Sequence, residues 1–209
     1  MTFWDDNATP AGVFNVGDMY HTYTRRQAIF IVEQLAIDVK QLKVEAGIVA
    51  DIGCGIGRLT FEVAHEAPYL DVVGVDPSPS MIEVARERLA ENDYLINHRV
   101  DFAETSDGPL LSGGYDGAWC VLTFQHLPDD TVKQHLADLF EILKPGARLV
   151  TQWVTRGEEG PMSYPRRRAT ILNWHAAAGF GSDGYILFGD ALVTGYSDDW
   201  MWVVAEKPA

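Results

Sequence analysis

The amino-acid sequence predicts a doubly wound α/β fold, in which a mostly parallel seven-stranded sheet carries helices on both faces and an antiparallel strand at its C-terminal edge. Short apolar runs alternate with segments of helical periodicity at least four times along the chain. The runs are apolar throughout, which is typical of strands that are buried on both faces. Alternation of this kind implies parallel pairing through right-handed crossovers, and hence a three-layer α/β/α architecture.

The expected elements follow one another in a regular order. The first helix is predicted where apolar residues recur at helical spacing between residues 28 and 39. Buried strands are predicted at 47–52 and 71–76, a strand of mixed character nearer an edge at 95–101, and further strands at 115–122 and 148–154. Helices are predicted between them at 58–67, 78–91 and 131–143. Ser78 is suited to cap the second of these helices, and Pro79 fits its first turn.

The last quarter of the chain departs from this alternation. A helix is predicted at 163–178, followed by strands at 184–189 and 200–206, with no clear helical repeat between them. We expect these two strands to form a hairpin-like pair, one of them antiparallel at the sheet edge. The chain is interpreted as one domain, residues 1–209. Its parts are an N-terminal cap region, a binding core and a C-terminal helix and hairpin, at 1–45, 46–155 and 156–209.

The charge and composition exclude several classes of protein. The 209 residues carry a formal net charge of −14, which repels a polyanion, so no nucleic-acid partner is expected. No apolar stretch approaches the roughly 20 residues of a membrane span, and no basic segment precedes an apolar run at the N-terminus. The sequence therefore predicts a cytoplasmic monomer or homodimer without a membrane partner. Cys54 and Cys120 are expected to be free thiols, and no Cys/His cluster has the spacing of a metal site.

The strongest motif is Asp51-Ile52-Gly53-Cys54-Gly55-Ile56-Gly57, between a predicted strand and a predicted helix. Glycines at such a turn let the backbone bend sharply and let a ligand approach without meeting a Cβ. The spacing is not that of dinucleotide dehydrogenases, and no phosphate-loop lysine follows. An acid before the first glycine suits a ligand with a cationic group near the turn better than a pyrophosphate.

Acidic residues are predicted at the ends of three successive strands, namely Asp51, Asp76 and Asp101. A carboxylate at the tip of the second strand can accept from both ribose hydroxyls of an adenosine. An acid at the tip of the third strand can accept from an adenine amino group. Three acids in register with strand ends therefore indicate a nucleoside site.

These segments resemble the motifs of the class I S-adenosylmethionine-dependent methyltransferases. The resemblance includes 49–57, 74–81, the pair Asp101-Phe102, 115–127 and the turn at 143–146, and it runs from about residue 20 to the C-terminus. It implies a small-molecule methyltransferase that uses S-adenosyl-L-methionine and releases S-adenosyl-L-homocysteine. The motifs are specific for the cofactor and leave the acceptor open.

The resemblance also implies a role for each cofactor residue. Asp51 and the backbone of the turn would hold the methionine amino group, and Asp76 the ribose hydroxyls. Asp101 would bind the adenine amino group, with other residues beside the ring or along the methionine portion. The expected cofactor residues are Tyr20, Arg25, Asp51, Gly53, Cys54, Gly55, Asp76, Pro77, Met81, Asp101, Phe102 and Cys120. Arg25 would reach the cofactor carboxylate, with Tyr20 and Tyr23 closing over it, although an exposed helix charge is an equal interpretation of Arg25.

The acceptor side is less well defined. Displacement at a sulfonium needs mainly alignment and exclusion of water, and a general base is useful only when the nucleophile must lose a proton. His126 follows the fourth predicted strand and is either that base or a structural residue. Further pocket candidates are Phe124, Gln125, Trp153, Arg156, Tyr164 and Trp174, which are interpreted either as an aromatic wall or as core.

The basic run Arg166-Arg167-Arg168 is interpreted as a solvated helix face in preference to an anion site, because three successive helical residues point in different directions. The partner expected from the whole sequence is a small-molecule acceptor with an N, O or C nucleophile. Two alternatives stay open: methylation of a peptide or protein, and a non-catalytic module that binds S-adenosylmethionine.

Overall fold

The seven-stranded mixed sheet of this protein has mostly parallel strands and helices in layers on its two faces, so the predicted fold class is confirmed. The computed structural model describes residues 6, 8–9, 20–39, 46–91, 94–105, 113–157, 163–181, 185–193 and 199–209. Its contacts divide the chain into two units, residues 1–33 with 37–107 and residues 34–36 with 108–209.

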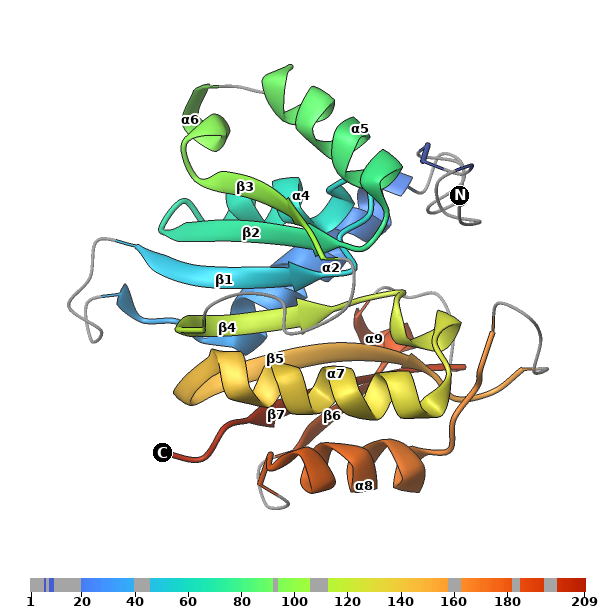
Figure 1. Ribbon diagram of the computed structural model, residues 1–209. Helices are drawn as coiled ribbons and strands as arrows, with labels where there is room; N and C mark the ends of the chain where they lie inside the picture. Colours follow the sequence, from blue (N-terminus) through green and yellow to red (C-terminus); the bar gives the residue numbers. More distant parts are fainter. Residues whose placement is uncertain are drawn as a thin grey trace. The chain divides into compact units, whose positions relative to one another are not determined.

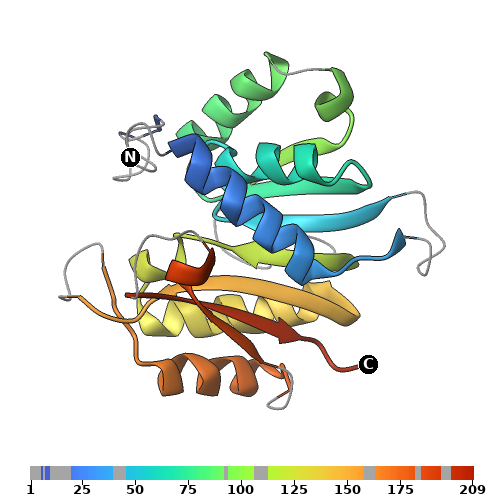
Figure 2. The ribbon, with the colours of Figure 1, turned by 180° about the vertical axis from the view of Figure 1, so that it is seen from behind.

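The first unit is a parallel three-stranded part of the sheet in the order β3-β2-β1. Its elements are α2 (Tyr20–Leu35), β1 (Gly47–Ile52), α4 (Arg58–Glu66), β2 (Leu70–Asp76), α5 (Pro79–Ala90), α6 (Tyr94–Asn97) and β3 (Val100–Glu104). Figure 2 shows α2 beside α4, on the side turned to the viewer. Ser78 caps α5 as predicted, because its Oγ accepts from the N–H of Met81 at 3.3 Å and Pro79 occupies the first helical position.

The second unit contributes four strands in the order β4-β5-β7-β6. Its elements are β4 (Tyr115–Cys120), η3 (Phe124–His126), α7 (Asp129–Ile142), β5 (Leu143–Val154), α8 (Arg168–Ala178), β6 (Ile186–Gly189), α9 (Asp190–Val193) and β7 (Trp200–Glu206). Figure 1 shows α7 in front of β5 with α8 next to it. The fully buried side chains of Trp119, Trp153 and Trp202 form much of this unit's core.

The C-terminal strands pair as predicted, and the position of the antiparallel strand differs. β7 pairs antiparallel with both β5 and β6. It therefore lies one strand in from the edge, and β6 is the edge strand. This arrangement protects β7 on both sides, which suits its almost continuous buried sequence Met201–Ala205.

Two further elements differ from the prediction. The expected third strand at 95–101 is replaced by the short helix α6 and a later strand, β3 at Val100–Glu104. The stretch after β6 was expected to lack helix, but Asp190–Val193 forms one helical turn. Both helices are short, and a single helical turn has too few residues to show a helical period in the sequence.

Candidate active site

The glycine-rich turn after β1 has the backbone conformation that its sequence predicts. Gly53, Gly55 and Gly57 have φ angles of 70°, 54° and 78°, in the left-handed region where a Cβ is unfavourable. The turn is closed onto β2, because the N–H groups of Gly53 and Cys54 both donate to the Val75 carbonyl, at 2.8 and 3.1 Å. The first unit thus presents bare backbone beyond the carboxyl end of β1.

Asp76 is the last residue of β2 and connects two turns through its carboxylate. Its Oδ2 accepts from the N–H of Gly55 at 2.9 Å, and its Oδ1 accepts from the N–H of Ser78 at 2.9 Å. Each carboxylate oxygen thus accepts one backbone hydrogen bond. The arrangement holds the carboxylate at a strand tip beside the glycine turn. Its chemistry fits a ribose diol, which would donate to the two oxygens.

Asp51 lies deeper than Asp76. Its side chain is 3% exposed, and its Oδ2 accepts from the Thr60 hydroxyl on α4 at 2.7 Å. The β1–β2 register pairs Asp51 with Gly74, two residues before Asp76. Asp51 therefore stands just behind the turn, where it adds negative charge below the backbone of the glycines. Its assignment to the methionine amino group remains a prediction.

The structure corrects the position of Asp101. It is the second residue of β3 and pairs with Val73, whereas the strand-end residue Asp76 pairs with Glu104. Three residues of strand separate Asp101 from that level, which is about 10 Å at about 3.3 Å per residue. The prediction that Asp101 ends the third strand is wrong, because α6 takes up the residues that were assigned to the beginning of this strand. Glu104 occupies the strand end, and the Asp101 carboxylate accepts from the N–H of Phe102 at 2.8 Å.

Phe102 is a packing residue. Its side chain is 2% exposed and meets Phe61 edge-on at 5.4 Å between ring centroids. A Cβ at Gly74 would come within 2.6 Å of the Phe102 ring, and one at Gly57 within 2.7 Å. The ring therefore fills the space that these two glycines leave. Met81 is likewise 2% exposed, whereas Pro77 is exposed, so of these three adenine-side candidates Pro77 offers the most surface.

The placement of Arg25 does not support its predicted contact with the cofactor. Its Nε donates to Glu66 at 2.8 Å, and its side chain is 65% exposed. Glu66 ends α4, about 12 Å along the helix from the glycine turn at about 1.5 Å per residue. Tyr20 lies in α2, but its side chain lies outside the described residues, and Tyr23 is buried.

Two cations lie at the glycine turn, and the motifs singled out neither: Arg88 donates to the Ile56 carbonyl at 2.7 Å, and Arg58 directly follows the turn. The Arg58 side chain is 6% exposed at the start of α4. Its Nη1 donates to the Thr24 hydroxyl at 3.0 Å and to Gln27 Oε1 at 2.7 Å. Arg58 therefore fastens α2 to the residue directly after the turn. The available signal was the pair of polar residues Thr24 and Gln27, which are buried in α2.

Both cysteines are buried thiols. Burial, together with the nearby charges of Asp51 and Asp76, raises the pKa of Cys54 well above its ordinary value. The protonated thiol packs against β2, since a Cβ at Gly74 would lie 3.1 Å from its sulfur. Cys120 is fully buried at the end of β4. Neither thiol has the exposed, electropositive setting of a reactive cysteine.

In the second unit, the chain turns directly after β4 into the short helix η3. Leu122 has a φ of 58°, an unusual value for a branched residue. Gln125 Nε2 lies 3.1 Å from His126 Nε2. An amide nitrogen can only donate, so this contact uses the imidazole Nε2 as its acceptor. A general base at Nε2 would have to give up this contact, which favours the structural interpretation of His126.

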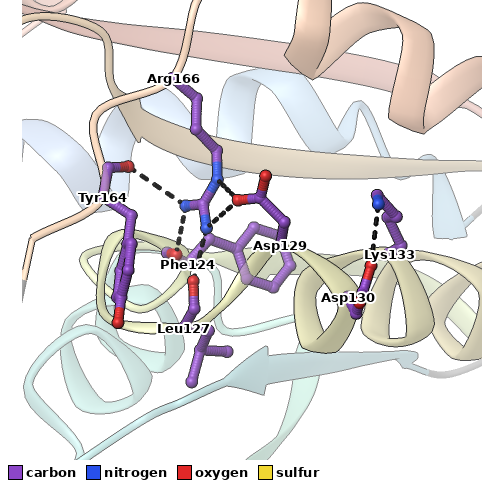
Figure 3. A network of polar contacts seen from close by, with 7 residues as sticks. All are labelled: Phe124, Leu127, Asp129, Asp130, Lys133, Tyr164 and Arg166. Carbon is purple, nitrogen blue, oxygen red and sulfur yellow. Dashed lines mark hydrogen bonds and ion pairs between the residues drawn. The ribbon is translucent and has the colours of Figure 1, made fainter.

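Arg166 fixes this segment, as Figure 3 shows. Its side chain is 4% exposed, and its guanidinium donates to the carbonyls of Phe124 at 2.8 Å, Tyr164 at 3.3 Å and Leu127. It also contacts Asp129 Oδ1 at 3.0 Å from Nε and from Nη2. The interpretation of Arg166 as a solvated helix residue is therefore wrong: it precedes α8 and is buried. Its neighbours Arg167 and Arg168 are exposed as expected.

The aromatic candidates divide between core and partly exposed positions. Phe124 and Trp153 are 0% and 1% exposed, with ring centroids 4.9 Å apart. They are core residues rather than a wall open to an acceptor. Trp174 and Tyr164 are half-buried, and Arg156 is exposed.

A buried histidine that sequence reasoning did not single out lies behind Trp153. His175 has no exposed surface, its Nδ1 donates to the Ile171 carbonyl at 2.8 Å, and its Nε2 lies 3.3 Å from the Thr151 hydroxyl. Trp153 donates to the same hydroxyl at 2.8 Å. Burial lowers the pKa of His175 to about 4, so the imidazole is neutral and belongs to the core network.

The comparison with protein families converges on the same segments. The family model described as a methyltransferase domain matches residues 50–149, which include the glycine turn, Asp76 and the segment after β4. Over residues 50–149 this chain is similar to the methyltransferase-domain family. The family resemblance predicted from the motifs is thereby confirmed.

The chain spans less than half the length of several curated relatives that it resembles. A demethylmenaquinone methyltransferase of Symbiobacterium thermophilum is 31% identical over 106 residues, which are 49% of this chain and 40% of that protein. The structure of the glycopeptide N-methyltransferase MtfA with sinefungin superposes with a TM-score of 0.73 at 16% identity, covering 88% of this chain and 87% of that one. The cyclase SpnF gives a TM-score of 0.70 at 19% identity, covering 88% and 82%. The two structural likenesses show the fold.

Two negative findings apply to the described part of the chain. Among those residues, no group of three or more His, Cys, Asp or Glu side chains is arranged to hold a metal ion. None of the described helices is long and apolar enough to span a bilayer.

Proposed function

We propose that this protein transfers the methyl group of S-adenosylmethionine to a small-molecule N, O or C nucleophile. The observation that carries the proposal is the Asp76 carboxylate at the end of β2, bonded to the N–H groups of Gly55 and Ser78. A carboxylate beside a glycine turn suits a neutral diol and a cationic amine better than a phosphate, and the adjacent Arg58 donates to Thr24 and Gln27 of α2.

Within this proposal each binding residue has one task. Asp76 accepts from the ribose hydroxyls, Asp51 supplies negative charge to the methionine amino group, and the bare backbone of Gly53 and Gly55 lets the ligand approach closely. The backbone at Cys120 is assigned to the methionine portion. S-adenosylmethionine supplies an electrophilic methyl group on a sulfonium, which already has a good leaving group. The protein then has to align the nucleophile and exclude water.

The adenine contact is the part of the proposal that has two candidates. The family resemblance assigns it to Asp101, whereas the strand register puts Glu104 level with Asp76. Pro77, which is exposed directly after Asp76, is assigned to the ring face. The net charge of −14 supports the absence of nucleic-acid partners. A cytoplasmic location and a monomeric or homodimeric state belong to the same proposal.

Two other functions are supported by specific observations. The acidic chain favours basic peptides as acceptors, which supports peptide methylation. The likeness to SpnF, a protein named as a cyclase, is a reminder that this fold serves more than one activity. A module that binds the cofactor without transferring its methyl group is the corresponding alternative here.

The test is to incubate the protein with methyl-labelled S-adenosylmethionine and, separately, a small-molecule pool and a basic-peptide pool. We expect label in the small-molecule pool and S-adenosylhomocysteine in equal amount, with both lost in the Asp76→Ala variant. The exposed residue Asp130 on α7, with a side chain 97% exposed, provides the control substitution Asp130→Ala. Label confined to peptides would support peptide methylation, and no transfer in spite of cofactor binding would support the binding module.

A further inference from the structure

The segment that follows β4 carries a buried polar group without a partner. Gln125 is 6% exposed, and its side-chain oxygen has no hydrogen-bond partner among the described residues. Its amide nitrogen is held by His126, which orients the side chain. Buried polar groups nearly always have partners, so a group left without one in a native structure calls for an explanation.

The backbone around Gln125 is fixed from both sides. Arg166 donates to the carbonyl before Gln125, that of Phe124, and to that of Leu127 two residues after it. The carbonyl of Gln125 itself accepts from the N–H of Tyr164 at 2.8 Å. Figure 3 shows the guanidinium between the carbonyls that it contacts. The unpartnered oxygen of Gln125 is therefore not the result of a loose loop.

The donors of Arg166 are fully used for this purpose. A guanidinium has five N–H groups in a fixed fork, and Arg166 makes five contacts, to three carbonyls and twice to Asp129. The rings of Tyr164 and Trp174 lie 5.6 and 5.3 Å from its guanidinium carbon. A lysine has three donors on a flexible stem and cannot reproduce this set of contacts.

The position of Gln125 in the fold indicates a ligand-binding role for its side-chain oxygen. Ligands of open α/β sheets bind beyond the carboxyl ends of the strands, and Gln125 lies five residues after Cys120, the last residue of β4. A rigidly held oxygen at this end of the sheet is suited to receive a hydrogen bond from a ligand.

We infer that Gln125 recognises the methyl acceptor, its side-chain oxygen accepting a hydrogen bond from a hydroxyl or amino group, and that Arg166 is the positioning residue that holds it. This inference rests on the proposed function and narrows it. The acceptor is then an alcohol, phenol or amine, and carbon acids without an N–H or O–H group are excluded. A buried hydrogen-bond acceptor discriminates against ligands that lack an N–H or O–H donor, because the Gln125 oxygen would then remain unpaired.

The test uses two probes that differ in one donor. Protein labelled with nitrogen-15 is saturated with S-adenosylhomocysteine and titrated with phenol or with anisole, while the side-chain amide resonance of Gln125 is followed. We expect phenol to shift this resonance with a Kd at least about tenfold lower than that of anisole, a difference of about 1.4 kcal/mol. Equal responses to the two probes, or no response to either, would overturn the inference.

Variants separate recognition from folding. Gln125→Met removes the side-chain oxygen. The affinity of this variant for phenol, measured from the resonances of the ligand, is expected to fall to the affinity for anisole. Gln125→Glu keeps an oxygen and should keep the preference, and Gln134→Met on the exposed face of α7 is the control. Arg166→Lys should abolish the preference while the Kd for S-adenosylhomocysteine changes less than about twofold. A preference that survives in Arg166→Lys would show that Arg166 has no positioning role.

The outcome also distinguishes this inference from the proposed function. Loss of S-adenosylhomocysteine binding in the unaltered protein would overturn both. Binding of S-adenosylhomocysteine without discrimination between phenol and anisole would overturn only the role of Gln125.

Discussion

The N–H of Gly55 donates to the carboxylate of Asp76 at 2.9 Å, so the turn after β1 and the end of β2 are one hydrogen-bonded unit. Preformed sites avoid the cost of ordering groups at the moment of binding. The bond means that Asp76 has two functions: it shapes the glycine turn and, in the proposed function, it binds the ribose.

A first prediction separates the two candidates for the adenine contact. Because Glu104 is level with Asp76 and Asp101 lies three residues earlier, Glu104→Gln should weaken S-adenosylhomocysteine binding by about tenfold, the effect of about 1.4 kcal/mol from one charge-assisted hydrogen bond. Asp101→Asn should change it less than about twofold. Titration calorimetry measures both variants. A larger loss of affinity in Asp101→Asn than in Glu104→Gln would assign the adenine contact to Asp101.

A second prediction concerns the glycine in β2. Gly74→Ala places a Cβ within 2.6 Å of the Phe102 ring, and overpacking of this kind costs about 1–3 kcal/mol. Urea unfolding should show that loss, and Phe102→Leu in the same chain should recover part of it. Gly189→Ala in β6 is the matched control, since nothing lies within 4 Å of its added Cβ. Equal stability of the two alanine variants would contradict the packing role of Phe102.

A third prediction compares two arginines of the first unit, Arg58 and Arg25. Arg58→Met removes two donors from buried partners, Thr24 and Gln27, and should lower the free energy of unfolding by about 2–3 kcal/mol. Arg25→Met removes an exposed pair with Glu66 and should cost less than about 1 kcal/mol. It should also leave S-adenosylmethionine affinity unchanged. A marked loss of affinity in Arg25→Met would restore the contact that the family resemblance implied.

A fourth prediction follows from the neutral His175. Its folded pKa of about 4 lies below the ordinary value of 6.5, so the unfolded chain binds more protons between these values. Stability is therefore complete above pH 6.5 and declines as pH falls toward 4, by about 1.4 kcal/mol per pH unit. His175→Gln should remove this slope, measured by urea unfolding between pH 5 and 6.5. An identical pH slope in the variant would refute the assignment.

The sequence predicted the elements whose signal is long or chemically distinctive. The strand at 47–52, the Ser78 cap and the left-handed glycines of the turn each follow from local rules, and the structure has them where they were expected. The acid at the end of the second strand was likewise correct, because the apolar run of β2 ends at Asp76.

Other features depend on tertiary contacts that no local pattern contains. The position of Asp101 was missed because β3 is only five residues long and is preceded by a four-residue helix. The burial of Arg166 arises from carbonyls about 40 residues away in sequence, which give no periodic signal. The contact of Arg58 with α2 has the same origin.

The most direct test of the account is titration calorimetry of the protein with S-adenosylmethionine, alongside Asp76→Ala and Asp130→Ala. The account predicts one site per chain with a micromolar Kd for the unaltered protein and for Asp130→Ala, and a Kd raised about a hundredfold in Asp76→Ala, which corresponds to about 2.7 kcal/mol. Absence of binding to the unaltered protein, or equal affinity in Asp76→Ala, would contradict it.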